Sequence, residues 1–218
     1  MIPIKNFSAA LLLPALFLFS CKTDPSANPE SKSASLQVRP GDCDDPDANI
    51  NCYFVNMPAT LSHIMSICGE EEPGERLHLT GTVYKADGKT PLPDVLLYAY
   101  HTNNKGIYAQ KGKETGVQKW HGYLHGWCRT DQNGRYEIQT IRPASYPKST
   151  APAHIHAAVK IPGGGKVFYI NDFVFKDDPY VSERESSDPR FPGGPGMVDV
   201  VKSEKGVWTG VRNLILSD

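Results

Sequence analysis

Residues 131–141 read DQNGRYEIQTI and decide the fold class of this 218-residue chain. The run Asp131-Gln132-Asn133-Gly134 is typical of a turn. From Arg135 to Ile141 polar and apolar residues alternate, and a strand places residues i and i+2 on the same face. A turn followed by clean alternation predicts a half-buried β-strand at residues 135–141.

The stretches on both sides of this strand have the same texture. Further strands are expected at residues 78–84, 94–100, 154–161, 166–175 and 207–216. Long irregular stretches at 102–130 and 177–196 interrupt the pattern. Several short strands with turns between them and almost no long helix predict an all-β fold, a β-sandwich of two mixed sheets with long loops.

One short helix is expected near the N-terminal end of the folded part. Leu61, Ile64, Met65 and Cys68 follow the spacing i, i+3, i+4, i+7, and Pro58 suits a first helical turn. We expect this short N-terminal helix to pack on the body of the domain.

The first 20 residues are interpreted as a signal peptide. Lys5 supplies a basic start, and the apolar run at 7–19 is shorter than the roughly 20 residues that span a bilayer. The run ends in Leu18-Phe19-Ser20-Cys21, which resembles the lipobox of bacterial lipoproteins, where the cysteine becomes the lipidated first residue. The alternative is an ordinary cleaved signal beside a coincidental cysteine. We expect export to the bacterial cell envelope and a membrane anchor at Cys21, on the periplasmic or outer-surface face.

Composition divides the remaining chain into three parts. Residues 21–41 are rich in Ser, Pro and Lys, which predicts a disordered tether after the lipidated cysteine. Residues 42–75 form a cysteine-bearing segment, and residues 76–218 form the sandwich domain. Removing residues 1–20 removes only Lys5, so 22 basic and 24 acidic residues remain, a net charge of −2. This near-neutral balance argues against a nucleic-acid partner.

Four cysteines besides Cys21 suggest disulfides, since an exported chain meets an oxidising environment. They are Cys43, Cys52, Cys68 and Cys128, and they allow three pairings. We expect Cys43–Cys52, which lie in one short loop, together with Cys68–Cys128. A zinc site is the competing interpretation, but the spacing C-x-x-C is absent from the sequence.

The candidate chemistry lies in residues 145–156, SYPKSTAPAHIH. If His154 begins a strand, then His154 and His156 project side by side and Ile155 turns into the core. Such pairs also occur by chance on many strands, so the neighbours decide. Tyr146 lies just upstream, and Tyr108 lies in the long irregular stretch at 102–130. Two imidazoles and two phenolates suit a hard, highly charged ion such as Fe(III), since a bound cation lowers the pKa of a coordinating phenol.

Motifs in a fixed order extend this pattern. Gly106-Ile107-Tyr108 is followed by RTDQNGRY at 129–136, TIRPASYP at 140–147 and PAHIH at 152–156. In these motifs the chain, over roughly residues 79–175, resembles the intradiol ring-cleaving dioxygenases, the non-haem Fe(III) enzymes of the catechol and protocatechuate type.

The resemblance implies one Fe(III) per chain with Tyr146 and His156 as axial ligands and Tyr108 and His154 as equatorial ligands. Tyr146 would also be catalytic, leaving the metal with a substrate proton when a catechol chelates. The partners would be a small catechol and O2, which is inserted between the two hydroxylated carbons to give a cis,cis-muconate-type dicarboxylate. The resemblance leaves monomer and homodimer both open.

The chain departs from the family around this centre. Ala151 stands where an arginine usually precedes the Pro-Ala-His-x-His run, and Asp172 stands where glutamine is frequent. The residues expected to line the substrate pocket are Trp120, Tyr123, Arg129, Arg142 and Asp172.

Two other functions were weighed against this enzyme. The departures, and a strand pattern that also resembles transthyretin-like modules, leave open a catalytically inactive metal-binding or ligand-binding module of the cell envelope. A serine hydrolase is disfavoured, because the sequence contains no G-x-S-x-G motif.

Overall fold

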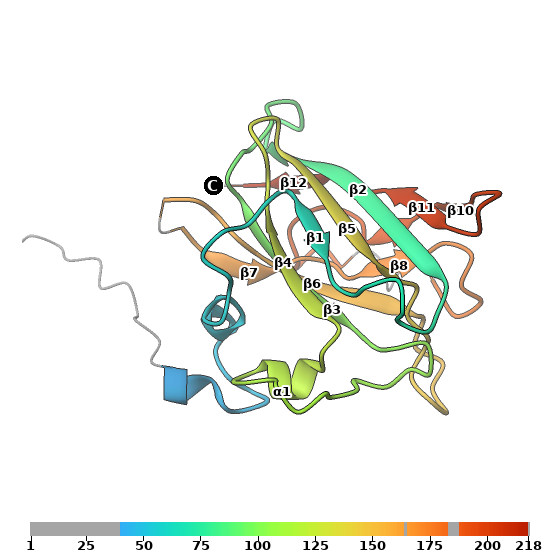
Figure 1. Ribbon diagram of the computed structural model, residues 1–218. Helices are drawn as coiled ribbons and strands as arrows, with labels where there is room; N and C mark the ends of the chain where they lie inside the picture. Colours follow the sequence, from blue (N-terminus) through green and yellow to red (C-terminus); the bar gives the residue numbers. More distant parts are fainter. Residues whose placement is uncertain (1–39, 164, 183–187, 218) are drawn as a thin grey trace, which may run out of the picture. The chain divides into compact units, whose positions relative to one another are not determined.

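The computed structural model describes residues 40–163, 165–182 and 188–217, which belong to one compact unit. Two six-stranded sheets make up this unit (Figure 1). The first sheet has the order β1-β5-β2-β11-β10, with β12 also paired to β2, and the second has the order β4-β3-β6-β8-β9, with β7 paired to β6. Each sheet contains parallel and antiparallel pairs, so the predicted β-sandwich of two mixed sheets is confirmed.

The strands are short, with the exception of β2. Those of the first sheet are β1 (Ile64–Ser66), β2 (Arg76–Lys85), β5 (Arg135–Ile141), β10 (Val200–Lys202), β11 (Trp208–Val211) and β12 (Leu214–Leu216). Those of the second are β3 (Leu96–His101), β4 (His125–Arg129), β6 (His154–Lys160), β7 (Val167–Tyr169), β8 (Phe173–Phe175) and β9 (Met197–Val198).

Strand β5 forms where the alternation predicts it. Tyr136 and Ile138 are buried, while Glu137 and Gln139 face outward. The turn before it needs a glycine, because Gly134 has φ 69° and a Cβ there would lie 2.6 Å from the carbonyl oxygen of Val83. Alternation therefore sets the face that β5 presents to the core between the sheets.

Two expected strands are each divided in the structure. Residues 166–175 form β7 and β8, and residues 207–216 form β11 and β12. Asn171 and Asp172 lie in the first break, and Arg212 lies in the second. Strand β4 was not expected, since it occupies the end of the long stretch interpreted as a loop. At each break, polar residues interrupt the continuous strand that the alternation predicts, so these residues do not belong to a sheet.

The helix expected around Leu61 to Cys68 is wrong. Residues Ile64–Ser66 form β1, which pairs in parallel with β5. Met65 and Ile67 are buried and their neighbours Ile64 and Ser66 are exposed, a period of two that the helix-like spacing concealed. Pairing with β5 satisfies backbone groups that a free edge would leave open. The helical turns of this N-terminal segment lie earlier, as 3₁₀ turns at Pro40–Cys43 and Ile50–Phe54.

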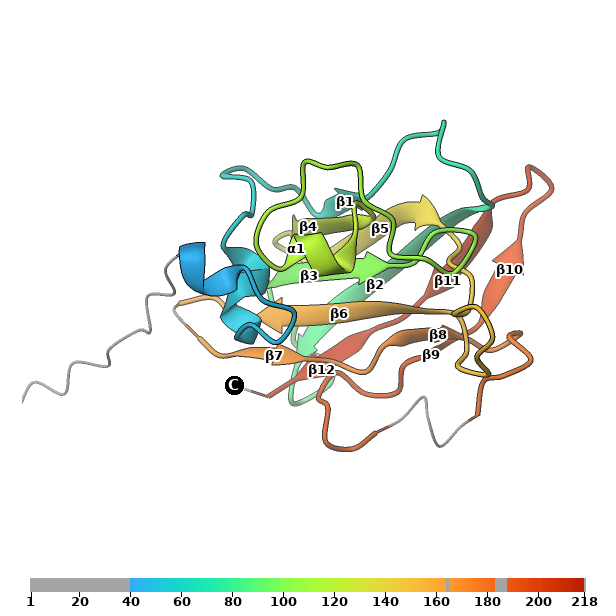
Figure 2. The same cartoon turned by 90° about the horizontal axis from the view of Figure 1, so that it is seen from below.

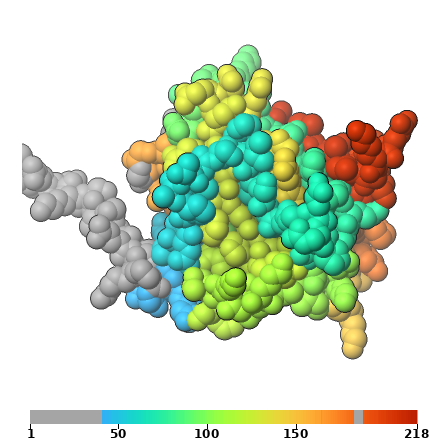
Figure 3. Space-filling model, in the orientation of Figure 1, coloured from blue at the N-terminus to red at the C-terminus, as the bar shows by residue number. Residues whose placement is uncertain are grey.

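The first part of the cysteine-bearing segment, residues 43–57, packs on the second sheet. A disulfide joins Cys43 to Cys52, as expected, with the two Cα atoms 5.3 Å apart. It holds Tyr53 and Phe54 against the buried Tyr98 of β3. In Figure 3 the segment, coloured blue to teal, covers part of the surface over the green and yellow-green residues.

The expected Cys68–Cys128 disulfide is wrong, because both cysteines are free. Cys128 is buried in β4 opposite Leu97. Cys68 lies beyond the end of β1, and its sulfur accepts a hydrogen bond of 3.2 Å from Nη2 of Arg76. The strand conformation of β1 carries Cys68 to a different edge of the core.

The predicted signal peptide, the predicted lipidation site at Cys21 and most of the predicted tether fall within residues 1–39, which lie outside the described part. Within the described part, no helix is long and apolar enough to cross a membrane. The only α-helical turn described is α1 (Gln118–His121).

A buried histidine makes the stability of this fold sensitive to pH. His101 is 1% exposed, donates from Nδ1 to the carbonyl oxygen of Thr102, and accepts at Nε2 from the hydroxyl of Thr140, each at 2.7 Å. Burial lowers the pKa of His101 from 6.5 to about 4. Between these two values His101 is protonated in the unfolded chain and neutral in the folded chain. The free energy of unfolding therefore falls as the pH drops from 6.5 toward 4.

The predicted effect of His101 is on the order of 3 kcal/mol over this window, since one pKa unit corresponds to about 1.4 kcal/mol. Urea unfolding of the parent chain and of His101→Gln, from pH 8 to pH 4, measures it. The free energy of unfolding should fall less for the variant than for the parent as the pH drops. The difference between the two chains at pH 8 measures the cost of altered packing, apart from the effect of pH. Parallel profiles would show that His101 is not the responsible group.

Candidate metal centre

The two histidines of the His-x-His pair project from β6 as the alternation predicts. Strand β6 lies between β3 and β8, and Figure 2 shows the three running side by side. Ile155 is fully buried, while His154 and His156 are half-buried on the opposite face. Their Nε2 atoms lie 3.0 Å apart.

Two tyrosines from separate loops complete the cluster. The Tyr146 hydroxyl lies 3.1 Å from Nε2 of His154 and 3.3 Å from Nε2 of His156. The Tyr108 hydroxyl lies 2.6 Å from that of Tyr146. The structure thus brings together all four residues predicted as metal ligands.

A glycine and an asparagine bring the two tyrosine loops into contact. Gly106 has φ 75°, and a Cβ there would lie 2.0 Å from the carbonyl oxygen of Ser145, so only glycine allows this approach. The backbone carbonyl of Asn103 accepts from the N–H of Ala144, and its side-chain oxygen accepts from the N–H of Ile107. These contacts hold Tyr108 beside Tyr146.

The hydrogen bonds of the histidines set their protonation. Nδ1 of His154 donates to the carbonyl oxygen of Pro152 at 2.7 Å, and Nδ1 of His156 donates to Oδ1 of Asp172 at 3.0 Å. With the proton on Nδ1, each neutral imidazole has a lone pair on Nε2. Two lone pairs therefore face one space, and a cation held between them and the tyrosine oxygens satisfies all four atoms. The residues fit a metal ion.

Burial keeps these groups neutral until a cation arrives. It raises the pKa of Tyr108 and Tyr146, and it lowers the pKa of His154. Neutral imidazole is the form that binds metal, so the lowered pKa of His154 favours its metal-binding form. The tyrosines bind as phenolates only if the ion is strongly charged, which favours a trivalent over a divalent metal.

A cavity of about 530 Å³ opens beside the histidines. It is lined by Tyr100, Ala151, Tyr169, Asp172 and Phe191, among others. Asp172 is therefore the one expected pocket residue that the cavity contains.

The other four expected pocket residues do not line this cavity. Trp120 lies on α1 and is 46% exposed. The Tyr123 hydroxyl donates to Glu72, and its ring lies under the ammonium of Lys111. Tyr123 therefore joins two loop segments, and Trp120 lies at the surface.

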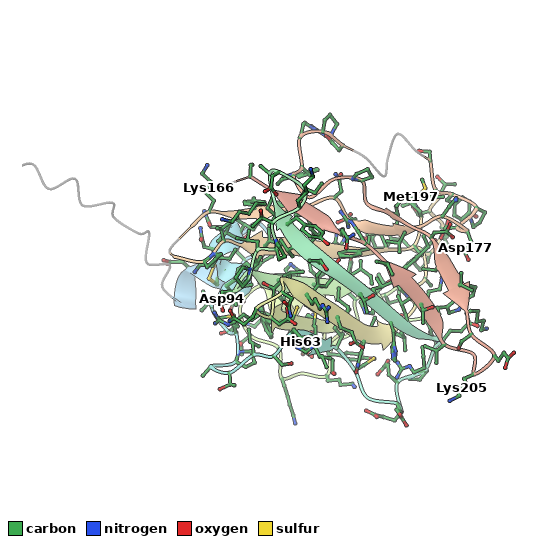
Figure 4. The ribbon with its side chains drawn as sticks, turned by 90° about the horizontal axis from the view of Figure 1, so that it is seen from above. His63, Asp94, Lys166, Asp177, Met197 and Lys205 are labelled. Atoms are coloured by element: carbon green, nitrogen blue, oxygen red, sulfur yellow. A yellow bond between two sulfur atoms is a disulfide. The ribbon has the colours of Figure 1, made fainter. Side chains whose placement is uncertain are left out.

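The two arginines are committed to carboxylates in different regions. Arg129 lies 4.0 Å from Asp94, and Arg142 forms two hydrogen bonds with Asp177, at 2.6 and 2.8 Å. Figure 4 shows Asp94 and Asp177 near opposite ends of the sandwich. The Arg142 guanidinium also stacks over the ring of Trp208. Neither arginine replaces the one that is absent at position 151.

Sequence reasoning missed the aromatic side of the cavity. Tyr100 lies at the end of the expected strand 94–100, and its ring stacks on His156 with the centroids 4.7 Å apart and on His121 at 3.7 Å. The contact between Tyr100 and His156 follows from the register of β3 with β6, in which the two residues lie directly opposite each other. Tyr169 is the last residue of β7 and Phe191 lies in a long loop, and neither position has a local pattern that indicates a cavity wall.

The hydrogen bond from His156 to Asp172 predicts a role for this carboxylate in metal retention. Partners that fix a ligating histidine are worth about 10–100-fold in metal affinity. Asp172→Leu should weaken iron binding by that factor, and Asp172→Asn, which keeps an acceptor, should weaken it less. Competition with a chelator measures both. Asp199→Leu is the control, because Asp199 is an exposed residue paired with Lys176. Equal affinity of Asp172→Leu and the parent would contradict the assignment.

Comparison with protein families gives one match over most of the described part. A family model described as Dioxygenase matches residues 51–187. Catechol 1,2-dioxygenase of Acinetobacter baylyi is 32% identical over 131 residues, which cover 53% of this chain and 41% of that protein. The protocatechuate 3,4-dioxygenase beta chain of Burkholderia cepacia is 31% identical over 134 residues, covering 57% and 53%. The chain thus spans about half the length of these relatives.

Solved structures resemble the fold. The dioxygenase domain of a dioxygenase–carbohydrate-binding protein fusion from Streptomyces sp. SirexAA-E has a TM-score of 0.56 at 22% identity, covering 74% of this chain and 92% of that one. Catechol 1,2-dioxygenase from Acinetobacter sp. ADP1, inhibited by bound mercury, has a TM-score of 0.54 at 25% identity, covering 74% and 59%.

Proposed function

This chain belongs to the intradiol ring-cleaving dioxygenase family, and we propose that it uses Fe(III) and O2 to cleave a catechol between its two hydroxylated carbons. The product is a cis,cis-muconate-type dicarboxylate. The observation that carries the proposal is the convergence of Tyr108, Tyr146, His154 and His156 on one space, with two imidazole lone pairs 3.0 Å apart.

Each ligand has a distinct task. His154 and His156 would hold one Fe(III) through Nε2, since their Nδ1 atoms are occupied by Pro152 and Asp172. Tyr108 and Tyr146 would bind as phenolates, and the four ligands would then balance two of the three positive charges. When bound, Fe(III) supplies the Lewis acidity and redox chemistry that make a catecholate ring reactive toward O2.

Tyr146 is the residue best placed to accept a proton from the substrate. Its oxygen is within 3.3 Å of both Nε2 atoms and of the Tyr108 hydroxyl, so it lies at the centre of the cluster. A catechol hydroxyl that enters this space meets the Tyr146 oxygen, which takes up the proton there.

The test is oxygen uptake by iron-loaded protein with a panel of catechols and hydroxyquinols, together with the visible spectrum. Tyrosinate-to-Fe(III) charge transfer should colour the protein red-brown. Tyr108→Phe should weaken that absorption and reduce oxygen uptake by more than about 100-fold, because even an outer partner of a ligand is worth 10–100-fold. Tyr84→Phe is the matched control, since Tyr84 lies on β2 in the other sheet.

Two results would overturn the proposal. A colourless protein without iron, purified from an iron-replete host, would argue against the metal. A coloured protein that consumes no oxygen with any catechol would argue against the activity and indicate a metal-binding relative.

We also propose that the chain is exported and anchored by a lipid at Cys21. The apolar run at 7–19 and the sequence Leu18-Phe19-Ser20-Cys21 support this. The Cys43–Cys52 disulfide is a second support, because disulfides persist in oxidising compartments.

Fractionation of cells tests the anchor. Cys21→Ala should move the protein from the membrane to the soluble fraction, while Ser33→Ala, in the same tether, should leave it with the membrane. An unchanged distribution of Cys21→Ala would refute lipidation.

A further inference from the structure

We infer that the cavity selects catechols whose ring substituent ends in a protonated amine, and disfavours those whose substituent ends in a carboxylate. The inference rests on the proposed function, which places the two catechol hydroxyls at the metal centre. It is carried by the acidic and aromatic lining of the cavity and by the absence of lysine and arginine from the described residues that line it.

The position of the cavity directs a substituent into it. His154 and His156 form one part of its lining, so a ring bound through its hydroxyls at their Nε2 atoms extends into the open space beside them. Ala151, whose side chain is small, is part of the lining. Residues 169–172 and Phe191 also line the cavity.

Asp172 supplies the uncompensated charge. Its side chain is 37% exposed, and Oδ1 accepts the hydrogen bond from His156. Its Oδ2 has no hydrogen-bond partner in the described part of the chain, which leaves a carboxylate oxygen available to a ligand. Asp188 also lines the cavity, but Arg190 binds it at 2.5–3.0 Å and balances its charge.

The basic residues near Asp172 face elsewhere. Arg212 is 4% exposed, with its guanidinium over the ring of Phe173 at 4.3 Å and its Nη1 donating to the carbonyl oxygen of Asn171. It therefore lies on the core side of residues 169–172. Among the described residues that line the cavity, Asp172 is a carboxylate without a lysine or arginine partner, while Arg190, which lies 6.0 Å from the centroid of the Phe191 ring, is bound to Asp188.

Two aromatic rings at the mouth add to the preference. The rings of Tyr169 and Phe191 lie 6.5 Å apart at 83° and are about two-fifths exposed. The face of an aromatic ring attracts an ammonium group and repels a carboxylate.

Asn171 holds this wall in place. Its side-chain nitrogen donates to the carbonyl oxygens of Asp188 and Gly194, at 3.2 and 3.0 Å, and its oxygen accepts from the N–H of Asp188. The rings and the carboxylate are thus positioned before a ligand enters.

The experiment compares three catechols with the same two-carbon arm, which ends in a methyl, an ammonium or a carboxylate group. For the iron-loaded protein, kcat/KM should decrease in the order ammonium, methyl, carboxylate, with about tenfold or more between the first and the last. The metal centre is common to all three, so its influence cancels in the ratio.

Asp172→Asn tests the responsible residue, because it removes the charge and keeps an acceptor for His156. The ratio between ammonium and carboxylate substrates should fall to within about threefold. Asp199→Asn removes the same charge from an exposed residue between β9 and β10 that does not line the cavity, and it should leave the ratio unchanged. Ala151→Arg, which adds a cation to the cavity lining, should favour the carboxylate substrate.

A second measurement separates this inference from the proposed function. Monophenols with the same three arms cannot chelate the metal, and calorimetry gives their Kd for the iron-loaded protein. If no catechol is cleaved but the Kd values follow the same order, the inference holds and the proposed function fails. If the three catechols are cleaved equally well, or if Asp172→Asn leaves their ratio unchanged, the inference fails and the proposed function stands.

Discussion

The structure depends on two imidazole lone pairs that are held 3.0 Å apart on one strand. Ile155 anchors that strand in the core and so forces His154 and His156 to the same outward face. Neither neutral imidazole carries a proton on Nε2, because the hydrogen bonds to Pro152 and Asp172 keep the proton on Nδ1. The arrangement is unfavourable without a cation, and the tyrosine loops bring the oxygens that complete its coordination.

The surroundings of this centre divide into a closed side and an open side. On the closed side, the contact between Gly106 and Ser145 holds the two tyrosine loops together. On the open side, the breaks in the expected strands create the cavity, because Asn171 and Asp172 lie between β7 and β8 and not within a sheet face. The same break that interrupts the hydrogen-bond ladder therefore supplies the carboxylate that accepts from His156 and lines the cavity.

The sequence predicts the parts of the site that strand periodicity controls. The alternation at residues 135–141 and the pair His154 and His156 needed only a period of two. The stretch at 102–130 was harder to interpret, because Trp120 and Tyr123 have the composition of a pocket wall, but Trp120 is exposed and Tyr123 contacts Glu72 and Lys111. The helix predicted at residues 61–68 was wrong for a related reason. A short apolar run fits both a helix and a strand, and the presence of a partner strand decides between them.

By itself, the sequence determined the fold class, the order of the ligand-bearing motifs and the pair of ligands on β6, since all three follow from local spacing along the chain. Only the tertiary structure decided which side chains reach the cavity. Tyr100 meets His156 through the register of β3 with β6, and Asp172 meets it through the pairing of β6 with β8. Arg142 is instead drawn to Asp177, 35 residues away along the chain. Such contacts join residues distant in sequence, and no local pattern of charge or hydrophobicity encodes them.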